Sequence, residues 1–200
     1  ALLTILLEPD ADPIHKVTII PRGPSMGATM FLPEKDRYLV RQRECLANIM
    51  VTFGGRIAEE LVFNDISSGA AMDLKGATEV ARRMVKEWGM SPSVGPVHYE
   101  GAGDGNGQEM FGFRDYSERT AREIDAEVKR TLEDCYRKAR ELMASNKNKL
   151  ESLAEALLAF EVLDAREVRQ IIEGKSLDRL SAERRETESA KLSDKPEDSE

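Results

Sequence analysis

The sequence predicts a mainly α-helical fold with a small β-sheet or hairpin near the N-terminus, ending in an antiparallel helical hairpin. β-branched residues bounded by proline and glycine occur within the first 32 residues, which is typical of short strands. Apolar residues recur at spacings of three, four and seven between residues 36 and 88, as on the buried face of a helix. A third, longer pattern of this kind begins at Ser117 and predicts a long amphipathic helix.

The first 32 residues are expected to form a helix end and two strands. Residues 1–7 are almost wholly apolar and stop before Pro9, which predicts the second half of a buried helix. No positively charged segment precedes them, so a signal peptide is disfavoured, and we expect the sequence to be cut from a longer one. Four β-branched residues within 16–23 predict one strand, and residues 27–32 predict a second.

Two helices are predicted next. The first covers residues 36–63 and is interrupted at Gly54 and Gly55, because a glycine inside a helix costs about 1 kcal/mol relative to alanine. Its expected apolar stripe consists of Leu39, Leu46, Ile49, Met50, Phe53, Ile57, Leu61 and Val62. The second runs from residue 72 to 88, and Gly89 is placed to end it.

The C-terminal half predicts a helical hairpin and a tail. A long helix over residues 117–146 is followed by a second helix around residues 150–158. Asp164 and Glu167 have the spacing of a capping box before a short helix that ends at Gly174. Residues 1–174 are therefore expected to form one domain. Residues 175–200 carry six basic and eight acidic side chains without an aromatic residue, which predicts a charged, disordered tail.

Composition excludes several classes of protein. The net charge of -8 argues against a nucleic-acid partner, because such modules need a basic face to neutralise phosphates. No run of 18 apolar residues occurs, so the sequence contains no membrane span. Two histidines and two cysteines that lie 90 residues apart nearly forbid a self-contained zinc site, which normally takes three or four cysteine, histidine or carboxylate ligands. Cys135 falls on the apolar face of its helix, where we expect it to be packed and inert.

Two acidic positions remain as candidates for chemistry. Asp73 falls in the first turn of the helix over 72–88, where a carboxylate interacts favourably with the helix dipole. The residues alone favour that structural role over metal binding. Glu60 lies near the end of the preceding helix; it belongs either to a solvated face or to the surroundings of a metal ligand that it orients.

Several motifs together resemble the peptidase domain of the FtsH family, the membrane-anchored AAA+ zinc metalloproteases. They are PIHKVTIIPRG at 13–23, FLPEKD at 31–36, GGRIAEELVF at 54–63, ARRMV at 81–85, WGMS at 88–91, IDAEV at 124–128 and LLAFEVL at 157–163. The resemblance covers about residues 1–173. Seven ordered motifs in register make chance agreement implausible.

The resemblance implies an ATP-dependent zinc endopeptidase that degrades protein substrates as a homo-hexamer. In that family two histidines of an H-E-x-x-H helix bind zinc, and an aspartate in a G-A-x-x-D-L stretch is the third protein ligand. The match at 69–74 assigns that role to Asp73. Glu60 remains our candidate for the residue that orients a metal ligand. H-E-x-x-H, with its general base, would lie immediately before Ala1, so we expect the 200 residues alone to be inactive.

The resemblance also implies a substrate strand and a cellular setting. Gly27, Ala28 and Thr29 would pair with an extended substrate, although Ala28 stands where the family commonly has tyrosine, and Met72 stands where it commonly has asparagine. The parent protein would bind ATP outside this chain, reach the membrane only through its missing N-terminal part, and work at the cytoplasmic face of a bacterial inner membrane. The alternative is a non-catalytic helical assembly module of the same ancestry.

Overall fold

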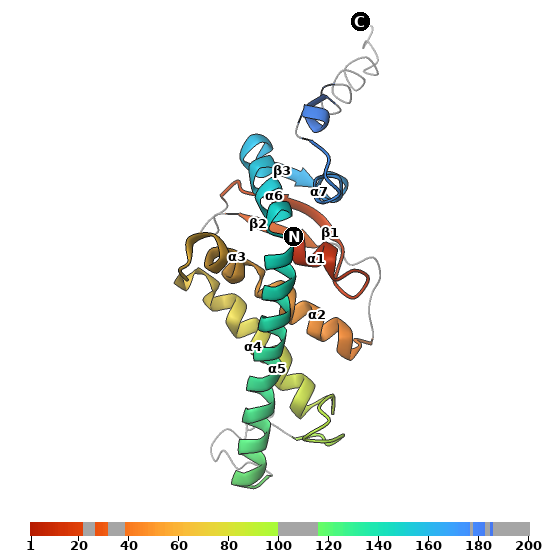
Figure 1. Cartoon of the computed structure of the whole chain (residues 1–200). Coiled ribbons are helices and arrows are strands. Elements are labelled where there is room, and N and C mark those ends of the chain that lie inside the picture. The colour runs from red at the N-terminus through yellow and green to blue at the C-terminus, as the bar shows by residue number, and fades with distance from the viewer. Residues whose placement is uncertain (22–26, 32–38, 100–115, 177, 183–184, 186–200) are drawn as a thin grey trace, which may run out of the picture. The chain divides into compact units, whose positions relative to one another are not determined.

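The computed structural model describes residues 1–21, 27–31, 39–99, 116–176, 178–182 and 185 (Figure 1). It divides into two compact units, each built from separate stretches of the chain. The sheet unit comprises residues 1–2, 14–32 and 146–200, and the helical unit comprises residues 3–13 and 33–145. The mainly helical fold with a small sheet confirms the predicted fold class.

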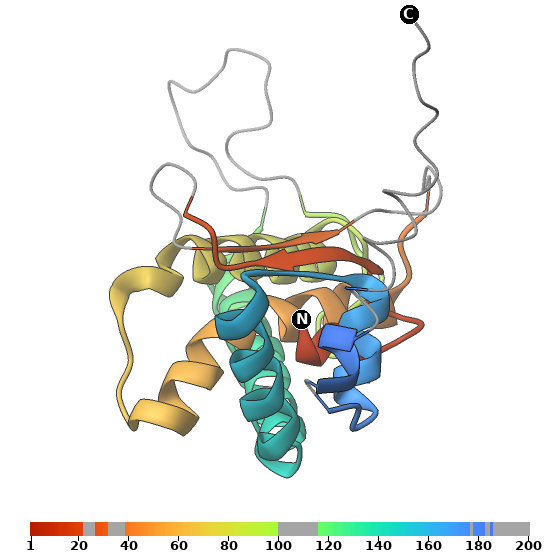
Figure 2. The ribbon, with the colours of Figure 1, turned by 90° about the horizontal axis from the view of Figure 1, so that it is seen from above.

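The sheet unit contains three antiparallel strands in the order β2-β1-β3. They are β1 (Ile14–Thr18), β2 (Ala28–Phe31) and β3 (Val162–Asp164), and Figure 2 shows them side by side. The first two strands confirm the sequence prediction, although β1 begins before Lys16 and ends at Thr18. The third strand was not predicted, because three residues directly after a helix are too few to show a period of two.

Gly27 allows β2 to lie close to β1. A Cβ atom at this position would come within 2.7 Å of the Thr18 carbonyl oxygen and 3.3 Å of the Ile19 Cα. Both are backbone atoms that cannot turn aside, so any larger residue would push the start of β2 away from the sheet.

Two helices of the sheet unit flank β3. They are α6 (Lys147–Phe160) and α7 (Ala165–Ile172). The predicted capping box of α7 is confirmed: the Asp164 carboxylate accepts from the Glu167 backbone N–H at 2.8 Å, and the Glu167 carboxylate accepts from the Asp164 N–H at 2.9 Å. Leu163 and Val168 are fully buried beside this cap and fix the chain between β3 and α7.

Part of the charged C-terminal segment is ordered. Residues 178–182 are helical, and Leu180 is only 1% exposed, so this leucine belongs to a packed surface. Residues 186–200 lie outside the described part of the chain. The domain boundary near residue 174 and the disorder of the tail stay predictions.

The helical unit is organised around three helices that pack on one another (Figure 1). These are α2 (Gln42–Thr52), α4 (Ala71–Lys86) and α5 (Glu118–Ser145), joined by α3 (Gly54–Phe63) and the short 3₁₀ helix η1 (Ser68–Ala70). The helix α1 (Leu2–Leu6) begins the chain. The most deeply buried side chains share an apolar or small character: Ile49, Ile57, Ala77, Ala81, Val85 and Ala139.

Two details of the helical prediction were wrong. The helix expected over residues 36–63 begins only at Gln42, whereas its predicted interruption is confirmed, because α2 ends at Thr52 and α3 begins at Gly54. Leu39 precedes that helix and is 87% exposed, so it takes no part in the apolar stripe. Val62 is also exposed, because it lies on the outer face of the last turn of α3. The long helix α5 agrees with prediction to within a residue at each end.

The antiparallel hairpin of α5 and α6 stays a prediction, because the two helices belong to different units, which divide between residues 145 and 146. Among the described residues, no helix is both long enough and apolar enough to cross a membrane.

Candidate metal-ligand site

Asp73 is the third residue of α4 and follows directly on η1. Its side chain is exposed, and its carboxylate has no hydrogen-bond or ion-pair partner among the described residues. Partial burial of the carboxyl raises the pKa of Asp73 even though the residue as a whole is exposed. An unpaired carboxylate at a helix start is available to bind a cation.

The turn that leads to Asp73 is held by Glu59. One carboxylate oxygen of Glu59 accepts from both the backbone N–H of Ser67 at 3.1 Å and the Ser67 hydroxyl at 2.9 Å. The Ser67 hydroxyl oxygen in turn accepts from the Gly69 N–H at 3.2 Å and caps η1. Glu59 therefore fixes the turn from which α4 and Asp73 begin.

Replacing Glu59 with alanine should loosen this turn. The contact between Glu59 and Ser67 holds three exposed hydrogen bonds in place, and each such hydrogen bond contributes about 0.5–1.5 kcal/mol. We therefore expect the Ser67 and Gly69 amide hydrogens to exchange roughly tenfold faster in the variant. Amide hydrogen exchange of the 200-residue chain measures this. Glu79→Ala, at an exposed position of α4, is the matched control. Equal exchange rates in both variants would show that Glu59 does not hold the turn.

Glu60 joins α3 to α5. Its two carboxylate oxygens accept from the Tyr136 hydroxyl at 2.5 Å and from the Arg140 Nε at 2.9 Å. These hydrogen bonds, led by that of Tyr136, lower the pKa of Glu60 and keep it ionised. The Tyr136 ring is fixed by an edge contact with Phe53 at 5.3 Å. Within the helical unit Glu60 thus has a structural role, and its support of a metal ligand stays a prediction.

The predicted substrate residues Gly27, Ala28 and Thr29 lie in the sheet unit. Ala28 and Thr29 are the first two residues of β2, which has β1 on one side only. In the described part of the sheet the other edge of β2 carries no strand, so its backbone groups can accept an added strand.

The described residues fit one ligand of a zinc site and not a complete set. A carboxylate oxygen is an ordinary zinc ligand, and Asp73 offers one. However, no group of three histidine, cysteine, aspartate or glutamate side chains that could hold a metal occurs in the described ranges. His15 is exposed on β1, and His98 bonds through Nδ1 to the Glu87 carbonyl oxygen at 3.1 Å.

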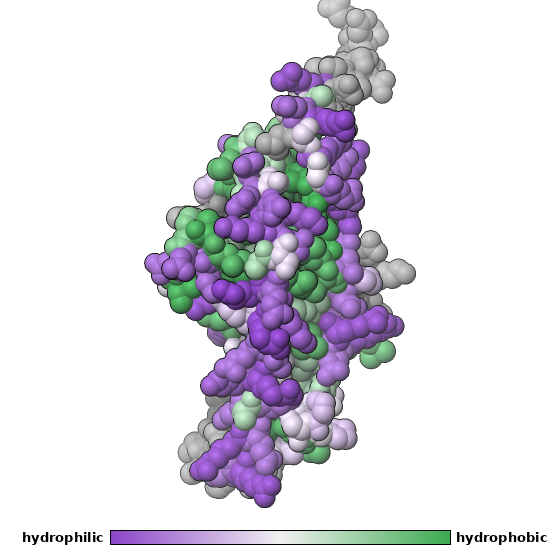
Figure 3. Space-filling model, viewed as in Figure 1, coloured by the Kyte–Doolittle hydropathy of each residue, from purple (hydrophilic) through white to green (hydrophobic). Residues whose placement is uncertain are grey.

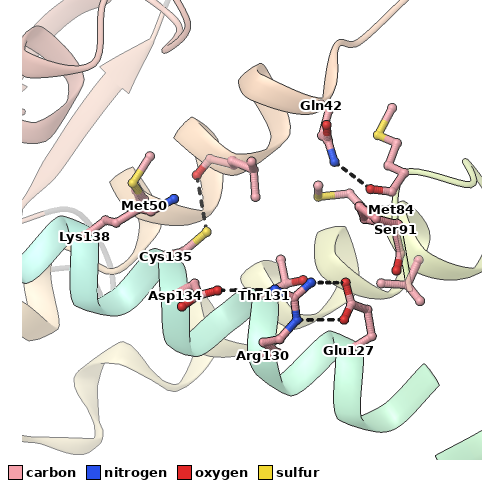
Figure 4. A pocket seen from close by; sticks show the side chains of 14 residues that line it. Gln42, Met50, Met84, Ser91, Glu127, Arg130, Thr131, Asp134, Cys135 and Lys138 are labelled. Carbon is pink, nitrogen blue, oxygen red and sulfur yellow. Dashed lines mark hydrogen bonds and ion pairs between the residues drawn. The ribbon is translucent and has the colours of Figure 1, made fainter. Parts of the chain in front are cut away.

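A cavity of about 250 Å³ lies elsewhere in the helical unit, between α2, α4, α5 and the turn after α4 (Figure 4). Glu127, only 5% exposed, lines it and binds Arg130 through two hydrogen bonds of 2.8 and 2.6 Å. These hydrogen bonds lower the pKa of Glu127 to about 2, and the Ser93 and Ser91 hydroxyls contribute. Sequence analysis missed this pair, although the three-residue spacing on one helix was a signal for it.

Cys135 lines the same cavity and is buried, as predicted. Burial raises the pKa of its thiol to about 11, so it is protonated at neutral pH, and the thiol group points toward the Leu46 carbonyl oxygen (Figure 4).

The described residues thus offer one candidate metal ligand, Asp73, and a small sheet with an open edge at β2. The sequence matches Peptidase family M41 over residues 1–171. The chain belongs to this family.

Its relatives bear the names of complete proteases. The chain is 50% identical over 176 residues to the ATP-dependent zinc metalloprotease FtsH 2 of Methylacidiphilum infernorum, a match that covers 86% of this chain and 27% of that protein. It is 46% identical to FtsH of Myxococcus xanthus, covering 90% of this chain and 28% of that protein, and 42% identical to FtsH of Bacillus subtilis, covering 82% and 26%. The chain therefore spans about a quarter of the length of these relatives.

Proposed function

We propose that this chain is the peptidase part of an ATP-dependent zinc metalloendopeptidase and that Asp73 is one of the protein ligands of the zinc ion. The observation that carries the proposal is the unpaired Asp73 carboxylate, which stands on a braced turn within the segment matched to family M41. The zinc dependence in the names of the relatives supports the choice of metal.

The other ligands would come from an H-E-x-x-H segment, which the 200 residues do not contain. When bound, zinc lowers the pKa of a coordinated water to about 7 and polarises the peptide carbonyl. The glutamate of that segment would be the general base. On this view the 200 residues alone bind zinc weakly and cleave nothing.

The chain's own residues would position both the metal ligand and the substrate. Asp73 holds negative charge at the start of α4, and Glu59 fixes the turn before it. Glu60 would support the site by locking α3 against α5. The open edge of β2, from Gly27 to Thr29, would pair with the extended backbone of a protein substrate.

The remaining features concern the whole protein. We propose that it binds ATP in a separate module, assembles as a homo-hexamer and is anchored at the cytoplasmic face of a bacterial inner membrane. The names of the relatives support the ATP dependence.

The proposal is tested with a chimaera in which this chain replaces the matching 176 residues of the Methylacidiphilum infernorum protease. We expect about one zinc ion per subunit and ATP-dependent cleavage of casein. A chelator should abolish cleavage, and added zinc should restore it. A well-folded chimaera that cleaves nothing would contradict the proposal and favour the non-catalytic assembly module.

A further inference from the structure

Thr4 is a polar residue in the interior of the protein. Hydrophilic side chains cover the long helix α5, where water can supply their hydrogen-bond partners (Figure 3). Thr4 lies in the middle of α1 and is 0% exposed. Its hydroxyl oxygen has no hydrogen-bond partner among the described residues. Because a buried polar group without a partner costs free energy, nearly all such groups in native proteins are bonded.

Other hydroxyls on the helices of this chain indicate where a partner of Thr4 should lie. Thr52, Thr78 and Ser145 each donate to the carbonyl oxygen of the residue four positions earlier, at 2.8, 2.7 and 2.9 Å. A hydroxyl inside a helix commonly bonds in this way. A threonine can also use the carbonyl three positions earlier, which for Thr4 belongs to Ala1. Thr4 makes no hydrogen bond to that carbonyl.

The remaining acceptor is the carbonyl oxygen four positions before Thr4. It belongs to the residue directly before Ala1, which in the proposed function is the second histidine of H-E-x-x-H. We propose that Thr4 is a positioning residue of the zinc site and that its hydroxyl donates to the backbone carbonyl of that histidine. This inference rests on the proposed function. The bond holds the backbone of a zinc ligand in helical conformation before the metal binds, and a pre-organised ligand binds at a smaller entropy cost.

Helix α3 connects α1 to the turn that carries Asp73. A Cβ atom at Gly54 would come within 3.4 Å of the Leu3 Cδ1, so α1 lies against the first turn of α3. In the second half of α3, Glu59 holds the turn that precedes Asp73. Ile57 lies between these two contacts and is fully buried, which anchors α3 in the helical unit. The helix that contains Thr4 and the turn before Asp73 therefore share one support.

The test uses Thr4→Val, which keeps nearly the same shape and removes the hydroxyl. In the 200-residue chain the substitution removes an unpaired buried hydroxyl, so we expect the melting temperature to rise by about 2–4 °C. In the chimaera the same substitution breaks the bond to the histidine, so we expect the dissociation constant of zinc to rise about 3- to 10-fold. Competition with a chelator measures that constant.

Two further variants of the chimaera separate the effect of the hydroxyl from that of packing. Thr4→Ser keeps the hydroxyl and should hold the zinc dissociation constant within about twofold of the unsubstituted value. Thr52→Val removes a hydroxyl that makes the same kind of bond within α2, and it should leave zinc binding unchanged. An equal loss of zinc affinity in Thr4→Val and Thr4→Ser would assign the effect to packing and overturn the inference.

The two proteins report on different parts of the inference. If Thr4→Val does not raise the melting temperature of the 200-residue chain, the hydroxyl already has a partner there and the inference is wrong. A Thr4→Val chimaera that binds zinc as tightly as the unsubstituted chimaera would also overturn it, while leaving the proposed function intact. An unsubstituted chimaera that binds no zinc would refute the proposed function and the role of Thr4 with it.

Discussion

Asp73→Asn should remove zinc and peptidase activity from the chimaera while leaving it folded. Asparagine has the same size but presents a neutral amide oxygen, which is a weaker ligand than a carboxylate. Residues that only support a zinc ligand typically contribute 10- to 100-fold to metal affinity, so losing a ligand should cost on the order of 100-fold or more. Zinc content after dialysis and the rate of casein cleavage measure the effect.

A neighbouring carboxylate provides the control. Asp65 is exposed in the same turn, and among the described residues its side chain bonds only to the Ile66 N–H. Asp65→Asn changes the charge by the same amount and should keep its zinc. Because the Asp73 side chain makes no hydrogen bond in the described part of the chain, Asp73→Asn should leave the melting temperature of the zinc-free protein nearly unchanged. Full zinc occupancy in Asp73→Asn would remove this residue from the site.

Glu127→Gln should destabilise the 200-residue chain by about 1–3 kcal/mol at pH 7. Removing one partner of a fully buried ion pair costs 3–5 kcal/mol, but the Arg130 side chain is 58% exposed and solvent screens the pair. The variant loses the ion pair and at least one of the two hydrogen bonds to Arg130, because glutamine keeps only one acceptor oxygen. Urea unfolding measures the difference.

The pH dependence of this effect follows from the pKa of Glu127. Folding lowers that pKa from 4.5 to about 2, so the ionised side chain stabilises the fold fully above about pH 5. The contribution disappears as the pH falls from about 5 toward 2, and the two proteins should converge in stability over that range. Glu123→Gln removes an acid from an exposed pair with Arg119 and should show little effect. A gap between Glu127→Gln and the unsubstituted chain that stays constant from pH 7 to pH 3 would contradict this assignment.

Local sequence patterns predicted the elements that depend on local interactions. The long helix α5, the two N-terminal strands and the cap at Asp164 agree with the structure, because periodicity and capping act over a few residues. Strand β3 could not be predicted from local patterns, because its three residues form a strand only when β1 lies beside them.

In the candidate site, too, the local features could be predicted from the sequence and the tertiary contacts could not. Periodicity placed Asp73 in the first turn of a helix, but only the motif resemblance gave it a metal role, since one carboxylate has no distinctive pattern. The hydrogen bonds that Ser67 donates to Glu59 and that Tyr136 donates to Glu60 join residues 8 and 76 positions apart. Such pairings follow from tertiary packing and cannot be read from a single sequence.

The central claim is that Asp73 binds zinc, and the zinc-edge anomalous signal in crystals of the zinc-loaded chimaera tests it most directly. We predict an anomalous peak with a carboxylate oxygen of Asp73 at about 2.0–2.2 Å, completed by ligands from outside this chain. A fully occupied zinc ion that does not contact Asp73 would contradict the claim.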